Sequence, residues 1–209
     1  MTDRGLDMKL RYSPTSPYVR KVSVTAIETG LDSRIERVET NVWDPQTDIG
    51  GSNPLGKVPT LILDDGTVLF DSPVVCEYLD SLHDGLKLFP AAGDARWQAL
   101  RLQALGDGVL DAAVHVVVEG RRDEALRSPG WIERQKTVIA RALDFLEEDV
   151  EMLSGDLSIG LISVGCALGY LDLRMPDDPW RRDHPALADW FETFSERTSM
   201  ASTVPADPV

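Results

Sequence analysis

A turn-rich segment that enters a short strand through proline constrains this chain more than any other feature. Its sequence is Asn-Pro-Leu-Gly-Lys-Val-Pro at residues 53–59, and the apolar residues 60–63 follow. Proline cannot donate a ladder hydrogen bond, so Pro59 belongs at a sheet edge or beside a ligand. A cis bond before proline costs only about 0.5–1 kcal/mol. We therefore predict a cis Val58-Pro59 bond that leaves the Val58 N–H and C=O outside the sheet, where an extended peptide can pair with them.

A second motif, Asp71-Ser72-Pro73, comes shortly afterwards and marks the start of a helix. Serine is a good N-cap residue and proline a good first helical residue. The N-terminus of a helix is a ready site for a carboxylate. Together, the two motifs predict a receptor for a short anionic peptide.

Four segments, in this order, resemble the glutathione S-transferase family, and the similarity extends over residues 8–205. They are residues 12–22, 53–61, 71–79 and 184–191. The resemblance is to small bacterial, serine-type members that act in detoxification. It implies an α/β thioredoxin-like N-terminal domain at residues 1–86 and an all-α C-terminal helical domain at residues 91–209. It also implies glutathione as co-substrate, a homodimer and no metal.

The composition limits which partners the protein can bind and in which cell compartment it is expected. A net charge of −14 argues against nucleic acid, because binding phosphates requires clustered Lys and Arg. No apolar run approaches the roughly 20 residues of a membrane span. Cys76 and Cys166 lie far apart in apolar contexts, so we expect reduced, buried thiols and a cytoplasmic protein.

The first half alternates between strand and helix patterns, in the order β-α-β then β-β-α. Gly30 is a plausible C′ residue of the first helix, and Asp-Gly before residue 67 indicates a hairpin. We expect a loop at residues 41–54. The expected strands are residues 9–12, 34–39, 60–63 and 68–70, and the expected helices are 17–29 and 73–83.

After a linker at residues 86–90 the pattern is helical throughout, at residues 94–121, 131–153, 158–174 and 185–195. Gly106 and Gly108 weaken or bend the first of these helices, at about 1 kcal/mol each. The helix at 158–174 is apolar enough to be the central buried one. Ser158 can cap it, but Leu161 stands where the family has the second half of a capping box.

Ser16 is the main catalytic candidate. It precedes Pro17 at a helix start, and without the resemblance it is most simply a helix cap. The family pattern Ser-Pro-x-x-Arg fits Ser16, Pro17 and Arg20, and it implies a hydroxyl that donates to the glutathione sulfur. Thr15, Ser13 and Tyr12 are the alternatives. The absence of cysteine here disfavours the cysteine-type mechanism.

The resemblance assigns the binding residues. Val58 and Pro59 hold the cysteinyl part of glutathione by backbone pairing, although Pro59 could be an ordinary strand-edge proline. Asp71 and Ser72 hold the γ-glutamyl end, and Asp71 is one methylene shorter than the usual glutamate. Lys57 either meets a carboxylate or is solvated.

A second-substrate cleft is predicted on the helical half. Asp107, Asp111 and His115 are spaced i, i+4, i+8 and share one helix face. They form a wall of this cleft, or else a solvated stripe or part of a dimer interface. Tyr170 borders the same region. A metal site is disfavoured, because carboxylates with one histidine are a poor zinc set.

These observations predict a glutathione transferase, in which the glutathione thiolate attacks an electrophilic small molecule. A free thiol is only about 3% ionised at pH 7, so the site must lower its pKa. Two alternatives remain, a glutathione-dependent peroxidase and a non-catalytic protein-interaction module.

Overall fold

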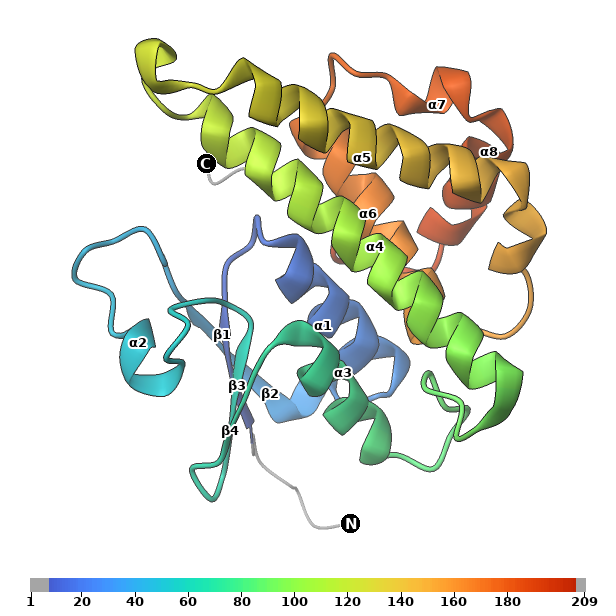
Figure 1. The fold of residues 1–209 in the computed structure, drawn as a ribbon. Helices are drawn as coiled ribbons and strands as arrows, with labels where there is room; N and C mark the ends of the chain where they lie inside the picture. The colour runs from blue at the N-terminus through green and yellow to red at the C-terminus, as the bar shows by residue number, and fades with distance from the viewer. Residues whose placement is uncertain (1–7, 206–209) are drawn as a thin grey trace.

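The computed structural model describes residues 8–205, and its first half is a mixed four-stranded sheet with helices (Figure 1). The strand order is β2-β1-β3-β4; β1 and β2 are parallel, and the other neighbouring pairs are antiparallel. This is the predicted thioredoxin-like arrangement. Its elements are β1 Met8–Tyr12, α1 Pro17–Glu28, a 3-10 turn Asp32–Arg34, β2 Ile35–Glu39, α2 Ile49–Ser52, β3 Thr60–Leu63, β4 Val68–Leu69 and α3 Ser72–Ser81.

The second half is helical, as predicted. Helices α4 and α5 lie side by side, and α6 packs against α4 (Figure 1). Every residue from 159 to 171 is buried, which confirms α6 as the central helix. The elements are α4 Gly93–Gly120, a 3-10 turn Glu124–Leu126, α5 Pro129–Glu148, a 3-10 turn Val150–Leu153, α6 Ile159–Arg174, α7 Trp180–Asp183, α8 Pro185–Ser195 and α9 Thr198–Ala201.

Several short elements differ from the sequence prediction. Helix α2 lies inside the predicted loop, because the buried side chain of Ile49 anchors a single turn that contains two glycines. Helix α5 ends at Glu148 rather than at residue 153, and a 3-10 turn follows. Helices α7 and α9 have four residues each, too few to show a helical period. Gly30 ends α1 with φ of 71°, as predicted for a C′ residue.

The two glycines of α4 have different roles, and neither interrupts the helix. A Cβ on Gly106 would lie 2.6 Å from the backbone carbon of Ser163, whereas a Cβ on Gly108 meets nothing within 4 Å. Gly106 therefore lets α4 and α6 approach closely, and Gly108 has no packing role.

Two alanine substitutions test this distinction. Gly106→Ala should destabilise the protein by about 1–3 kcal/mol, because the backbone of α6 must move away. Gly108→Ala is the matched control and should stabilise by up to about 1 kcal/mol through helix propensity alone. Urea unfolding of both variants measures the difference, and equal effects would contradict the proposed close contact.

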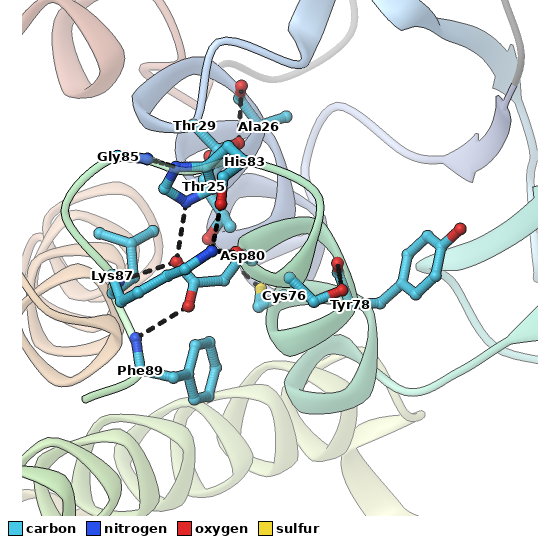
Figure 2. A network of polar contacts seen from close by, with 12 residues as sticks. Thr25, Ala26, Thr29, Cys76, Tyr78, Asp80, His83, Gly85, Lys87 and Phe89 are labelled. Atoms are coloured by element: carbon cyan, nitrogen blue, oxygen red, sulfur yellow. Dashed lines mark hydrogen bonds and ion pairs between the residues drawn. The ribbon is translucent and has the colours of Figure 1, made fainter. Parts of the chain in front are cut away.

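The linker between the two halves is fixed by a buried carboxylate (Figure 2). Asp80, on α3, accepts hydrogen bonds from the backbone N–H groups of Leu88 at 2.8 Å and Phe89 at 3.2 Å. His83 contacts the same carboxylate at 3.0 Å. Lys87 donates to the Asp80 carbonyl at 2.6 Å. The start of the helical half is thus tied to the end of the sheet half.

The start of α6 differs from the prediction that the Ser158 side chain caps it. Ser158 is the N-cap residue, but its side chain makes no capping hydrogen bond. Instead, the Ile159 N–H donates to the Leu88 carbonyl at 2.9 Å. The linker backbone therefore satisfies an N–H at the start of a helix whose sequence lacks the full capping box.

Both cysteines are free and buried, as predicted. Burial raises the pKa of the Cys76 thiol to about 12 and that of Cys166 to about 11, so neither is a nucleophile at neutral pH. Within residues 8–205, the helices are all too short or too polar to cross a membrane.

Candidate functional site

Three predicted site segments meet at one end of the sheet. Arg11 in β1 is opposite Thr60 in β3, so the loop after β1 and the residues before β3 lie at the same end. Leu61 is opposite Leu69 in the antiparallel β3–β4 pair, which brings the segment after β4 there as well. This end is opposite the β3–β4 hairpin (Figure 1). The fold therefore gathers residues 13–16, 57–59 and 71–72.

Ser16 is the N-cap of α1, as predicted. Its Oγ accepts a hydrogen bond from the Val19 N–H at 3.4 Å, which is long for this type of bond. Because the oxygen accepts, the hydroxyl proton can still be donated to a ligand. The neighbouring hydroxyls of Ser13 and Thr15 contact each other at 3.4 Å. Tyr12 is the last residue of β1 and packs partly against the core.

The Val58-Pro59 bond is cis, which confirms the prediction. Strand β3 begins only at Thr60, and in residues 8–205 no backbone hydrogen bond pairs the Val58 N–H or C=O. The Lys57 side chain is exposed. Its carbonyl accepts hydrogen bonds from Asn53 Nδ2 at 3.0 Å and Thr60 Oγ1 at 2.9 Å. Asn53 and Thr60 thus fix the segment through the Lys57 carbonyl, while the N–H and C=O of Val58 stay unpaired.

The third segment differs from the prediction by one position. Helix α3 begins at Ser72 itself, and Asp71 is the N-cap residue without a side-chain capping bond. Ser72 is buried and Asp71 is exposed. The Phe70–Asp71 bond is also cis. Because Ser72 is the first helical residue, its hydroxyl and N–H lie at the positive end of the helix dipole, where a carboxylate is stabilised.

Asp107, the first of the three residues predicted to share one face of α4, contacts α1 through a buried ion pair. Lys21 Nζ lies 2.6 and 2.7 Å from the two carboxylate oxygens of Asp107. The Lys21 side chain is 0% exposed and that of Asp107 is 20% exposed. Burial raises the pKa of Asp107 against the lowering effect of Lys21, and the charges of Asp111 and Asp71 raise it further. Asp107 is thus no part of a solvated stripe, and its carboxylate lies within electrostatic range of Asp71.

One turn further along α4, and one turn nearer the N-terminus of α1, the Tyr18 hydroxyl donates to the Asp111 carboxylate. Burial and this hydrogen bond raise the pKa of Tyr18, so its hydroxyl stays protonated at neutral pH. The exposed His115 packs against Trp131 of α5 with ring centroids 5.8 Å apart. Tyr170, on α6, is buried.

Two cavities in the structure lie away from these residues. One of about 260 Å³ lies between α5, the end of α6 and residues 178–184. The other, of about 400 Å³, lies beside the linker and the start of α6. Neither is lined by a predicted site residue. In the described part of the chain, no three His, Cys, Asp or Glu side chains are grouped to hold a metal ion.

Three contributors to this site were missed by the sequence prediction. Asn53 was interpreted only as a turn residue, although an asparagine before proline is a signal for side-chain bonding to nearby backbone. Tyr18 and Lys21 follow Ser16 on the same helix, but their partners are 93 and 86 residues away. No local pattern predicts such pairs.

Comparisons with known proteins agree with this fold. The family description "Glutathione S-transferase, N-terminal domain" matches residues 15–82, and "Glutathione S-transferase, C-terminal domain" matches residues 129–193. An uncharacterized GST-like protein of Escherichia coli, YibF, is 33% identical over 95% of this chain and 98% of its own length.

Crystal structures of a glutathione transferase family member from Pseudomonas fluorescens Pf-5 are also similar. The structure with bound glutathione has 44% identity and a TM-score of 0.92, and covers 97% of this chain and 100% of its own. The structure with bound S-(propanoic acid)-glutathione has 44% identity and a TM-score of 0.88, and covers 95% of this chain and 100% of its own. From its residues, its fold and these matches, the chain belongs to the glutathione S-transferase family.

Proposed function

We propose that this protein is a glutathione transferase that ionises the glutathione thiol and directs it at an electrophilic small molecule. One observation carries the proposal. Three features that complement an anionic peptide thiol meet at one end of the sheet: the unpaired Val58 backbone, the start of α3 at Ser72 and the capping hydroxyl of Ser16. The related Pseudomonas protein holds glutathione, which supports the same ligand here.

Binding follows from these groups. The Val58 N–H and C=O pair with the backbone of the cysteinyl residue, as a strand pairs at a sheet edge. The γ-glutamyl carboxylate lies at the N-terminus of α3, against Ser72. Asp71 meets the γ-glutamyl ammonium, and Lys57 is available to the terminal carboxylate. The cysteinyl sulfur then lies beside the first turn of α1.

Ser16 acts on the sulfur. Its hydroxyl donates to the thiolate, and the N-terminal dipole of α1 adds to the stabilisation. The thiol proton leaves to solvent. The sulfur lone pair then forms a bond to the electrophilic carbon, and the leaving group departs with its bonding electrons. Holding both reactants together supplies the rest of the acceleration.

Retention on immobilised glutathione and elution by the free tripeptide test the binding step. We expect retention by the wild-type protein and elution at millimolar glutathione. Turnover is then assayed with an aryl halide and an organic peroxide. Preference for the peroxide would indicate a glutathione-dependent peroxidase. Retention on immobilised glutathione without turnover of either substrate would indicate a non-catalytic interaction module. Failure to bind would contradict the proposed function.

The wider assignments belong to the same proposal. The domains are residues 1–86 and 91–209, the protein acts in the cytoplasm in detoxification, and it forms a homodimer. Light scattering at micromolar concentration checks the dimer, with an expected mass of twice the 23.1 kDa chain. A mass of one chain would contradict it.

A further inference from the structure

The electrophile must bind beside Tyr18 and Asp111, if the proposed function holds. In a productive complex the reacting carbon lies about 3–3.5 Å from the sulfur. The proposed function places the sulfur beside Ser16, which caps the first turn of α1, and Tyr18 belongs to that same turn. The Tyr18 hydroxyl binds the Asp111 carboxylate of α4. This pair therefore lies at the same end of α1 as the proposed position of the sulfur.

Around the Tyr18–Asp111 pair there are more carboxylates than cationic side chains to neutralise them. Asp107 is neutralised by the buried Lys21, with contacts of 2.6 and 2.7 Å. Asp111 is exposed, and the hydroxyl of Tyr18 orients its carboxylate without cancelling the charge. A substituent on the sulfur thus meets the uncompensated negative charge of Asp111.

We propose that Asp111, oriented by Tyr18, makes the electrophile site select neutral or cationic substrates over anionic ones. The residue determines specificity and takes no part in bond formation. A negative charge on the substrate close to Asp111 is repelled, while a neutral isostere is accepted. The substrate class is therefore an electrophile without a carboxylate near its reactive carbon.

An isosteric pair of glutathione conjugates isolates the effect of charge. S-(propanoic acid)-glutathione is a suitable anionic probe, since the related Pseudomonas protein binds it. S-(propanamide)-glutathione has the same shape and no charge on the substituent. Calorimetry at an ionic strength of about 0.1 M should give an affinity for the amide about tenfold above that for the acid.

Two charge-removing variants of α4 provide the comparison. Asp111→Asn should bring the amide-to-acid ratio close to one without lowering affinity for the amide. Asp94→Asn makes the same change at an exposed position about 25 Å along the helix, well beyond the Debye length of about 10 Å, and should leave the ratio unchanged. Asp111→Lys should invert the ratio.

The outcomes separate this inference from the proposed function. The inference is overturned if the wild-type protein binds both conjugates equally, or if Asp111→Asn does not change the amide-to-acid affinity ratio. Either result leaves glutathione binding intact. If neither conjugate binds, the proposed function fails and the inference fails with it. Because Asp111 is exposed, both asparagine variants should melt within a degree or two of the wild-type protein.

Discussion

Ser16→Ala should lower turnover at pH 7 by up to about 25-fold while leaving glutathione affinity almost unchanged. A thiol with a pKa of about 6.5 is roughly three-quarters ionised at pH 7, whereas at a pKa of about 8.5 it is about 3% ionised. Loss of the donated hydrogen bond removes most of this difference. Binding persists because the Val58 backbone and the start of α3 do not depend on the hydroxyl. Steady-state kinetics and calorimetry measure the two effects.

The stability of the same variant separates catalysis from helix capping. The Ser16 Oγ accepts from Val19 at 3.4 Å, so its loss should cost at most about 1 kcal/mol. Thr15→Ala is the control, because the Thr15 hydroxyl contacts Ser13 rather than the start of the helix. Loss of turnover in Thr15→Ala but not in Ser16→Ala would mean that the wrong hydroxyl has been assigned. Normal turnover in both would support a non-catalytic role.

Asp107→Leu should destabilise the protein by about 3–5 kcal/mol, because it leaves the Lys21 ammonium buried without a counter-charge. The Lys21 side chain is 0% exposed and its Nζ contacts both Asp107 oxygens. Burial of an isolated charge is among the most costly changes in a protein interior. Urea unfolding at neutral pH measures the loss.

The double variant Lys21→Met with Asp107→Leu is the matched control. Replacing a buried ion pair by apolar side chains of similar size is often neutral or stabilising. We therefore expect the double variant to recover most of the stability that the single variant loses. If the single substitution costs less than about 1 kcal/mol, water reaches Lys21 and the pair is not the buried link between α1 and α4 described above.

Much of the local structure around the candidate binding residues could be predicted from the sequence, because its signals are local. The Val58-Pro59 turn, the start of a helix at Ser72 and the cap at Ser16 each depend on a few adjacent residues whose backbone preferences are strong. The alternation of strands and helices then places all three at one end of the sheet. Only the register at Ser72 was wrong, by one residue.

The helical half was predicted less well, because its contacts join residues far apart in the chain. The i, i+4, i+8 spacing of Asp107, Asp111 and His115 shows that they share a face, but it does not show what that face meets. The structure pairs Asp107 with Lys21 and Asp111 with Tyr18. In the same way, the sequence marks Gly106 as a weak helix residue, and only the packing against Ser163 explains it.

The ionisation of glutathione on the wild-type protein tests the central claim most directly. The ultraviolet absorbance of the thiolate is titrated against pH with the tripeptide free and bound. We predict that binding lowers the pKa of the thiol by about two units, to about 6.5, and that in the Ser16→Ala complex the pKa returns most of the way to the free value of about 8.5. A bound thiol with an unchanged pKa would contradict the proposal that this site activates glutathione.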